Sequence, residues 1–314
     1  METIAVLLMA YGSPESIDEL EPYLLDIRGG RTTSPELVAE IRSRYLQIGG
    51  RSPLLDITRA QAQALEQELN RRFEREPVRF RAYVGMRHWQ PRIREAVAQI
   101  HADGIKKVVG LVMAPHQSRM SSGAYFEKLN AANIELGSPL EIIRIDSWHE
   151  EPGLIDALAE NAAKALSGFD AFPYVIFSAH SLPERILAQG DPYDRQLRRT
   201  AVLVAERLAL REGRWQFCYQ SAGQSSETWL GPAIEKVIAA LAQNGEKNIL
   251  VVPVGFVCDH VEILYDLDVV AKKVARQNGA HLERCQSLNI TPAFISALAD
   301  IVGTHCLCTS TAWV

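Results

Sequence analysis

The sequence contains neither a long hydrophobic run nor a block of positive charge. No apolar stretch reaches the roughly 18 residues that a membrane-spanning helix needs. The short apolar run near the N-terminus follows no basic leader, and we read it as a first strand rather than a signal peptide. The formal net charge is −5 and Lys and Arg form no cluster, which argues against binding to nucleic acid or to an anionic membrane. We therefore expect a cytoplasmic protein that is not integral to a membrane.

Cysteine is scarce, and the common nucleotide-binding motifs are absent. The five cysteines, which suit a compartment where thiols stay reduced, are Cys218, Cys258, Cys285, Cys306 and Cys308. Cys306 and Cys308 could contribute to a metal site, but a four-thiolate iron–sulfur cluster needs further ligands and no cysteine follows Cys308. We therefore do not expect a [2Fe-2S] cluster. The chain also has no G-x-G-x-x-G after a strand and no Walker lysine motif, which disfavours a nucleotide ligand.

What the sequence does contain is an internal duplication. Residues 91–112, PRIREAVAQIHADGIKKVVGLV, align without gaps with residues 232–253, PAIEKVIAALAQNGEKNILVVP. Each copy has a proline at a helix start, apolar residues at helical spacing, a glycine at the helix end and then a buried strand. A second similarity joins residues 4–14 with residues 174–183, where Tyr11 of the first copy takes the place of His180 of the second.

This duplication predicts an α/β fold made of two similar Rossmann-like domains. Each domain is expected to hold a mostly parallel sheet flanked by helices, with a cleft between the domains. The length of 314 residues fits two domains, which we place at residues 1–165 and 166–314. Whether the C-terminal helix after Pro292 packs back on the N-terminal domain is left open.

The segment Ile249–Asp268 is a candidate for chemistry. It begins as a strand buried on both faces. It then brings acids and a histidine together within ten residues, namely Asp259, His260, Glu262, Asp266 and Asp268. If this part is helical, Glu262 and Asp266 share one face and His260 points elsewhere. The alternative is a solvated helix start, because acids favour the first turn of any helix.

His180 follows another predicted buried strand and precedes Pro183 in a tight turn. Parallel sheets bring several strand ends to one crevice, so His180 can face Glu262 there. An imidazole and a carboxylate suit proton transfer and the binding of a divalent first-row metal. The alternative is a structural role, which is the commoner one for a lone histidine in such a turn. His116 also ends a strand, but in the N-terminal half, and is less central.

Arginines beside glycine pairs mark a second region, between Leu24 and Pro53. Arg28 and Arg31 lie beside the first glycine pair and Arg51 beside the second, with Arg42 and Arg44 on a predicted helix between them. The planar guanidinium group of arginine can donate two parallel hydrogen bonds to a carboxylate or a phosphate. A solvated helix face explains Arg42 better than it explains the loop arginines. The implied ligand is anionic but is not a nucleotide.

These segments resemble the ferrochelatases, enzymes that insert ferrous iron into a porphyrin. The resemblance extends over nearly the whole chain and rests on LLMAYGSP (7–14), RYLQIGGRSPL (44–54), FSAHSLPE (177–184), GDPY (190–193), WLGP (229–232) and VPVGFVCDHVEILYD (252–266). It implies two Rossmann-like domains that enclose a porphyrin cleft. It also implies a lyase that forms nitrogen–metal bonds, in which His180 and Glu262 handle iron and pyrrole protons, with Asp266 as a relay.

Within this family the sequence is most similar to the coproporphyrin type of Gram-positive-like bacteria, because Tyr11 follows the first strand. In that branch this tyrosine is an axial ligand to the product iron. The resemblance implies porphyrin contacts from Tyr11, Arg28, Arg44, Tyr45, Ser52 and Tyr125. The substrates are then coproporphyrin III and ferrous iron, with no organic cofactor, and the product coproheme passes transiently to the next enzyme of heme biosynthesis. The chain departs from the family pattern at Ser13, where a threonine is usual, and in the segment before Tyr125.

Other functions fit parts of this pattern. A protoporphyrin IX ferrochelatase would share the fold and the pair of His180 and Glu262. A cobalt chelatase of corrin synthesis should lack the rim of Tyr11 and Arg28, and a heme carrier without enzymatic activity would not need Glu262. Metallation rates on coproporphyrin III, protoporphyrin IX and sirohydrochlorin, with iron and with cobalt, would separate these functions. The sequence leaves open which of His180 and Glu262 is the base and which guides iron.

Overall fold

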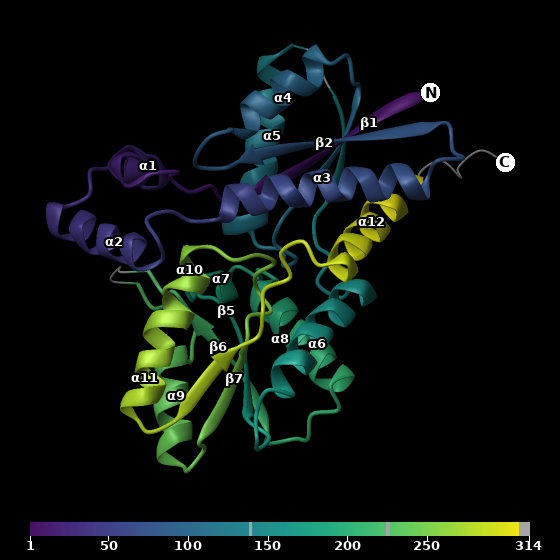
Figure 1. The fold of residues 1–314 in the computed structure, drawn as a ribbon. Coiled ribbons are helices and arrows are strands. Elements are labelled where there is room, and N and C mark those ends of the chain that lie inside the picture. The colour runs from purple at the N-terminus through teal and green to yellow at the C-terminus, as the bar shows by residue number, and fades with distance from the viewer. Residues whose placement is uncertain (138–139, 224–226, 308–314) are drawn as a thin grey trace.

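Two four-stranded parallel sheets form the framework of the molecule (Figure 1). The computed structural model describes residues 1–137, 140–223 and 227–307. The first sheet has the order β2-β1-β3-β4 and the second the order β6-β5-β7-β8. The strands are β1 (Glu2–Ala10), β2 (Val78–Met86), β3 (Lys107–Val112), β4 (Glu141–Ile145), β5 (Tyr174–His180), β6 (Trp215–Gln220), β7 (Asn248–Val252) and β8 (His281–Arg284). The predicted α/β class is confirmed. We call the part from β1 to β4 the first half and the part from β5 to β8 the second half.

The duplication seen in the sequence is also present in the fold. Within each half the first strand lies between the second and the third. The helices that align in sequence, α4 (Ile93–Ala102) and α9 (Ile234–Gln243), each lead into the third strand of their sheet. Each of these helices is followed by a glycine with positive φ, Gly104 at 73° and Gly245 at 94°. This left-handed conformation commonly ends helices and is easiest for glycine.

Helices cover both faces of each sheet. The first sheet packs against α3 (Leu54–Arg72) on one face and against α4 and α5 (Ala124–Glu135) on the other. The second sheet packs against α6 (Pro152–Leu166) and α8 (Tyr193–Arg207) on one face and against α9 and α11 (Lys272–Gln277) on the other. The strands are therefore continuous apolar runs, and every residue from Ala5 to Met9 is fully buried.

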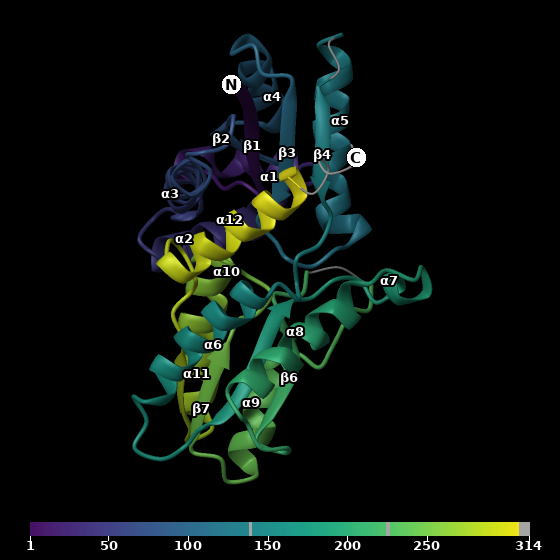
Figure 2. The same cartoon turned by 90° about the vertical axis from the view of Figure 1, so that its right-hand side faces the viewer.

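The C-terminal helix α12 (Pro292–Leu307) packs on both α3 and α6 (Figure 2). Arg72 of α3 forms an ion pair with Asp300 of α12 and donates a hydrogen bond to Ser296. This helix therefore contacts the first half, the arrangement that the sequence left open. Because α6 packs on β7 and α8 of the second half, we propose a domain boundary before Pro152 in place of the expected one at residue 165.

Further helices lie in the connections after the carboxyl ends of the strands. They are α1 (Leu20–Ile27), α2 (Pro35–Gln47), α7 (Arg185–Ala188) and α10 (Val261–Leu264), with π-helical segments at Arg119–Gly123 and Asp266–Ala271. On the left of Figure 1, α1, α2 and α10 gather where the two halves meet. Val261 of α10 packs against a buried cluster that contains Tyr23 of α1 and Tyr45 of α2. Among the described residues, no helix combines the length and apolar character that crossing a bilayer requires.

Candidate active site where the two halves meet

His180 and Glu262 lie side by side at the carboxyl edge of the second sheet. His180 is the last residue of β5, and Glu262 lies in α10, which follows the neighbouring strand β7. The Nε2 atom of His180 is 3.4 Å from Oε1 of Glu262, and the two side chains are 28% and 36% exposed. The pair can therefore be reached from outside the sheet. The structure thus brings together the two residues that the sequence proposed for iron and proton handling.

A glycine makes this approach possible. After β7 the chain passes close over the end of β5, where the N–H of Gly255 donates to the carbonyl of Ser178 (3.2 Å). A Cβ atom on Gly255 would lie 2.5 Å from the Cβ and 2.9 Å from the Cα of Ala179, the residue before His180. The absence of a side chain at Gly255 therefore lets the segment that carries Glu262 pack against the strand that carries His180.

A second histidine contacts the other oxygen of Glu262. The Nε2 atom of His260 is 3.3 Å from Oε2 of Glu262, and its Nδ1 atom bonds to the carbonyl of Cys258 (3.1 Å). The expectation that His260 points elsewhere is therefore wrong. It assumed helical backbone, whereas His260 precedes α10 with extended backbone (φ −160°, ψ −177°), so its side chain turns back toward Glu262.

The end of β6 holds the backbone of the same helix. Gln220, the last residue of β6, donates to the main-chain carbonyl of Glu262 (3.1 Å) and accepts from the hydroxyl of Ser178 (2.8 Å). Gln220 is 2% exposed and Ser178 is fully buried. The position of Glu262 is therefore fixed from two neighbouring strands, by a buried polar network in which the Gln220 amide donates and accepts.

The electrostatics of the pair favour a charged histidine next to an ionised carboxylate. Burial alone would lower the pKa of His180, but the charge of Glu262 and a hydrogen bond with it outweigh burial and raise the pKa above its ordinary value. Burial likewise opposes ionisation of Glu262, but His180 and His260 hold its pKa below the usual range. The Nδ1 atom of His180 bonds to the carbonyl of Ser181, which directs Nε2 toward Glu262.

The remaining acids of this segment separate into two kinds. Asp266 accepts a hydrogen bond from Ser221, and burial together with the charge of Glu262 raises its pKa to about 6. Asp268 instead forms a 2.8 Å ion pair with Arg284, and Asp259 lies 3.3 Å from the same guanidinium. Because their charges are paired within the second half, Asp259 and Asp268 support the fold, and only Asp266 remains as a relay candidate beside Glu262.

Three of the predicted rim tyrosines lie within electrostatic range of Glu262 from the first half. Burial is the main cause that raises the pKa of Tyr11 to about 12, and the charge of Glu262 adds to it. The same two causes raise the pKa of Tyr45 and of Tyr125. Tyr11 follows β1, the strand equivalent to β5, so it occupies in the first half the position that His180 has in the second. Tyr11 is also 43% exposed, unlike the buried Tyr45 and Tyr125.

Three arginines of the first half have buried donors without acceptors. The Nε atoms of Arg28, Arg44 and Arg87 are inaccessible to solvent and have no hydrogen-bond partner among the described residues. The guanidinium of Arg44 lies 5.5 Å from the ring centre of Tyr265 in the second half, and that of Arg87 lies 5.4 Å from the ring of Tyr125. Arg44 also forms an ion pair with Glu40 (2.5 Å), so each of these two groups keeps only part of its donors unused. Guanidinium groups are suited to the carboxylate oxygens of a ligand.

Sequence reasoning missed Arg87. It follows the carboxyl end of β2, and the rule that strand ends carry the chemistry would have included it. Arg87 donates to the carbonyl of Met120 (3.1 Å) and lies 6.0 Å from the ring centre of Tyr11. Its neighbour His88 was missed as well, and its ring lies 4.7 Å from that of Tyr11 while its Nδ1 bonds to Asp26 (2.9 Å).

Ser52 and Tyr45 have structural contacts of their own. The hydroxyl of Ser52 accepts from the N–H of Leu54 (3.3 Å) at the start of α3, and Ser52 is buried. Tyr45 is 3% exposed and packs with Leu20 and Leu24 of α1. A porphyrin contact by either residue remains an expectation from the resemblance.

Metal-binding groups are few in the described part of the chain. No three His, Cys, Asp or Glu side chains there are grouped as a metal site would require. Cys306 is buried near the end of α12, and Cys308 lies outside the described residues. The nitrogen and oxygen donors of His180 and Glu262 fit a metal ion that passes through as a substrate.

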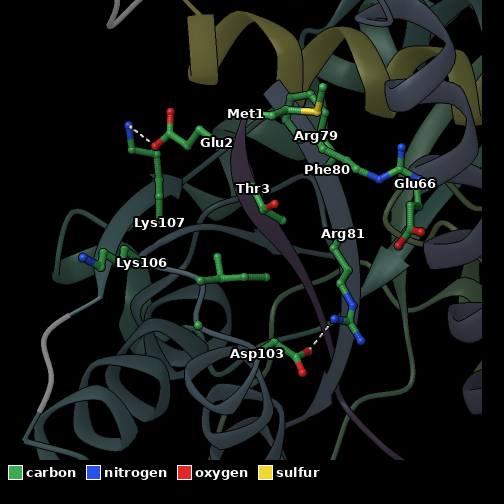
Figure 3. Close-up of a pocket in the computed structure, with 12 residues that line it drawn as sticks. Met1, Glu2, Thr3, Glu66, Arg79, Phe80, Arg81, Asp103, Lys106 and Lys107 are labelled. Carbon is green, nitrogen blue, oxygen red and sulfur yellow. Dashed lines mark ion pairs between the residues drawn. The ribbon is translucent and has the colours of Figure 1, made fainter. Parts of the chain in front are cut away.

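A cavity of about 650 Å³ lies far from this site (Figure 3). It opens at the amino-terminal ends of β1, β2 and β3, the opposite edge of the first sheet. Some of its charged side chains pair with one another, Arg81 with Asp103 at 2.9 Å and Lys107 with Glu2 at 3.6 Å. None of the residues that the sequence predicted for the site lines this cavity.

Comparisons with known proteins match this chain to one family. The family model described as Ferrochelatase matches residues 3–306. Ferrochelatase of Herpetosiphon aurantiacus is 45% identical over 302 residues, which cover 95% of this chain and 97% of that protein. Coproporphyrin III ferrochelatase of a Geobacillus species is 42% identical over 304 residues, with 95% and 96% covered.

Solved structures match in fold alone. SirB from Bacillus subtilis with Fe3+ superimposes with a TM-score of 0.58 at 11% identity, over 99% of this chain and 98% of that one. CbiX, the terminal enzyme for biosynthesis of siroheme in denitrifying bacteria, superimposes with a TM-score of 0.52 at 12% identity, over 96% and 98%.

Proposed function

Since the chain belongs to the ferrochelatase family, whose members insert iron into porphyrin in heme biosynthesis, we propose that its substrate is coproporphyrin III and its product coproheme. The observation that carries this proposal is the set of three arginines whose buried Nε donors lack acceptors, Arg28, Arg44 and Arg87. Coproporphyrin III has four propionates and protoporphyrin IX has two. Three guanidinium groups, each with an Nε donor that has no partner among the described residues, therefore suit the more anionic porphyrin.

Some of the relatives support the same choice of substrate. The Geobacillus proteins bear the name coproporphyrin III ferrochelatase. Others, from Herpetosiphon aurantiacus and Deinococcus radiodurans, bear only the name ferrochelatase. The names alone therefore do not decide between the two porphyrins, and the arginines support the proposal of coproporphyrin III.

The proposed binding mode places the porphyrin between the halves. Tyr11, Arg28, Arg44, Tyr45, Ser52 and Tyr125 are the proposed contacts from the first half, joined by Arg87. His180 and Glu262 then approach the macrocycle from the second half. In this mode the propionates bind the arginines, and the binding energy of these remote groups can stabilise a distorted macrocycle whose nitrogen lone pairs point out of the plane.

The proposed chemistry follows from the charges of the pair. Iron insertion replaces two pyrrole N–H protons by Fe2+, so two protons must leave. In the proposed resting site His180 carries a proton and Glu262 is ionised, the states that their shifted pKa values favour, so the carboxylate is the group that can attract Fe2+. The positive charge of arriving iron lowers the pKa of His180, so His180 releases its proton to water and can then accept a pyrrole proton. Each of the two pyrrole protons leaves to water by this route. Asp266, with its pKa of about 6, can exchange protons near neutral pH.

Replacement of the histidine tests this assignment. We expect His180→Ala to abolish iron insertion into coproporphyrin III while porphyrin binding, followed by fluorescence titration, is retained. His281→Ala is the matched control, because His281 is an exposed histidine of β8 (61%) that contacts Glu283 and the ring of Phe169, and it should keep full activity. Near-normal turnover by His180→Ala would rule out the catalytic assignment.

Competing substrates test the choice of porphyrin. We expect anaerobic assays with Fe2+ to give a kcat/KM at least tenfold higher on coproporphyrin III than on protoporphyrin IX. Faster metallation of protoporphyrin IX would identify a protoheme-forming enzyme. Insertion of cobalt into sirohydrochlorin, without iron insertion into either porphyrin, would identify a corrin-pathway chelatase.

Coproheme is also proposed to pass transiently to the next enzyme of the pathway.

A further inference from the structure

Asp191 is a nearly buried carboxylate that bonds to both halves of the molecule. It is 9% exposed and lies in the loop before α8 of the second half. Its Oδ2 atom accepts from the hydroxyl of Ser118 (3.0 Å) and from the N–H of Arg119 (2.8 Å), both in the first half. Its Oδ1 atom accepts from the N–H of Tyr193 (3.0 Å), the first residue of α8. One carboxylate therefore joins two segments that are far apart in the sequence.

On the first-half side, Asp191 holds the segment that carries two rim residues. Arg119 begins the π-helical segment that runs directly into α5, where Tyr125 is the second residue. Within this segment the carbonyl of Met120 accepts from Arg87 (3.1 Å). A shift at Arg119 would therefore move both Tyr125 and the partner of Arg87.

On the second-half side, Asp191 holds a residue that contacts the catalytic histidine. The hydroxyl of Tyr193 donates to the main-chain carbonyl of His180 (3.0 Å), and Tyr193 is 8% exposed. A shift at the start of α8 would therefore reach the end of β5, where His180 lies beside Glu262.

The charge of Asp191 suits this double contact. The N–H groups of Arg119 and Tyr193 belong to the first turns of two helical segments, and both point at the one carboxylate. Helix N-termini carry partial positive charge, so an ionised carboxylate is stabilised from both sides. A neutral amide has one acceptor oxygen and an NH2 group, so it can satisfy only one side and would set donor against donor on the other.

We propose that Asp191 is a positioning residue, which keeps His180 of the second half in a fixed position relative to Tyr125 and Arg87 of the first half. This inference rests on the proposed function. Asp191 touches neither substrate in this scheme. It acts through Tyr193 on the catalytic side and through Arg119 on the porphyrin side.

The test uses full-length Asp191→Asn and Asp191→Ala with Fe2+ and coproporphyrin III, assayed well below the Tm of each variant. We expect kcat to fall at least tenfold in both variants. Ser118→Ala removes one of the three contacts of Asp191, together with the hydrogen bond that the Ser118 hydroxyl accepts from the N–H of Met120 (3.2 Å). It should lower kcat by about threefold, and it tests the proposal if the larger changes prevent folding. In a double-mutant cycle, adding Tyr193→Phe to Asp191→Asn should cause no further loss, because both changes act through one chain of contacts.

Asp194→Asn is the matched control. Asp194 lies in the first turn of the same helix but accepts from Tyr219 (2.5 Å) and Arg198 (2.9 Å), both in the second half. Asp194→Asn should lower the Tm and leave kcat within twofold of the wild type. Two results would overturn the proposal. One is a kcat of Asp191→Asn within twofold of the wild-type value. The other is a double variant whose loss of kcat equals the product of the losses in Asp191→Asn and Tyr193→Phe.

An NMR measurement separates this inference from the proposed function. The ring signals of His180 should shift in Asp191→Asn and stay unchanged in Asp194→Asn, and this comparison needs no activity. Unchanged His180 signals in Asp191→Asn would refute the positioning role, even with an active wild type. A wild-type protein that metallates no porphyrin would refute the proposed function, whatever the His180 signals show.

Discussion

At the residue scale, the acids after β7 differ in what neutralises them. Asp268 is paired with Arg284, a guanidinium that is only 11% exposed. Asp266 accepts a hydrogen bond from Ser221, and burial raises its pKa from the ordinary 3.8 to about 6. The charge of Asp268 therefore stabilises the folded state, whereas the charge of Asp266 destabilises it. A buried charge that opposes folding is typical of residues kept for function.

This difference predicts opposite effects of two similar substitutions. Above pH 6 the ionised Asp266 destabilises the folded state, because its folded pKa is raised. Asp266→Asn should therefore increase the free energy of unfolding by about 1–2 kcal/mol at pH 8, and this gain should vanish as the pH falls below about 4. The same substitution should slow iron insertion. Urea unfolding at both pH values, together with steady-state assays, measures the two effects.

Asp268→Asn is the contrasting variant. It removes a partner from the buried Arg284, so the free energy of unfolding should fall by about 1–2 kcal/mol while turnover stays near the wild-type value. If Asp268→Asn slowed iron insertion as much as Asp266→Asn, the division of the acids into a structural and a functional kind would be wrong.

Several features of the site could be predicted from residue types and strand ends. His180 and Glu262 both follow apolar strands that are neighbours in the sheet, so their meeting follows from topology. The direction of His260 could not be predicted, because it depends on where α10 begins. The pairing of Asp259 with Arg284 could not be predicted from the sequence either, because it depends on β8 being the edge strand beside β7.

At the element scale, the approach of the β7–α10 connection to β5 fixes the distance between His180 and Glu262. The duplication predicted the α4–β3 and α9–β7 units because their helix starts, glycine ends and apolar spacing are all local features. The π-helical segments at Arg119–Gly123 and Asp266–Ala271 were not predicted. A π-helical turn is wider than an α-helical one, but these segments are too short to change the spacing of apolar residues in the sequence. Tertiary contacts such as those of Ser118 and Ser221 stabilise them.

Gly255 offers a direct test at this scale. A methyl group on Gly255 would lie 2.5 Å from the Cβ of Ala179, so β5 and the β7–α10 connection must separate. Gly255→Ala should lower the free energy of unfolding by about 1–3 kcal/mol and lower kcat severalfold, as measured by urea unfolding and steady-state assay.

A glycine outside the site provides the comparison for this variant. Gly168 follows α6, and a Cβ there would meet only the carbonyl of Ala165 at 3.4 Å. Gly168→Ala should leave kcat unchanged. Equal kcat values for the Gly168→Ala and Gly255→Ala variants would show that the close approach at Gly255 does not set the geometry of the pair.

At the scale of the whole molecule, buried polar contacts join the halves. His116 of the first half is 2% exposed, and its Nε2 bonds to the hydroxyl of Thr200 in α8 (2.9 Å). Burial lowers the pKa of His116 to about 3. Sequence analysis gave His116 only a minor place, and the contact with Thr200 could not be seen in the sequence because it depends on how the two halves dock.

This contact predicts that acid destabilises the molecule. The unfolded chain binds a proton at His116 near pH 6.5, whereas the folded chain does so only near pH 3. The free energy of unfolding should therefore fall by up to about 1.4 kcal/mol per pH unit from this residue alone as the pH decreases through that range. His116→Gln keeps a donor for Thr200 but cannot titrate, so its loss of stability with acid should be smaller. Parallel pH dependences for the two proteins, measured by urea unfolding between pH 7.5 and 4, would contradict this role.

The path of the chain between the halves has a mechanical consequence. The chain crosses once between β4 and α6, and again between β8 and α12, which returns to pack on α3. Two separate crossings restrain the relative motion of the halves more than a single linker would, and the buried contacts of Asp191 and His116 add to this restraint. We therefore expect Tyr11 and His180 to keep nearly the same relative position with and without a bound ligand.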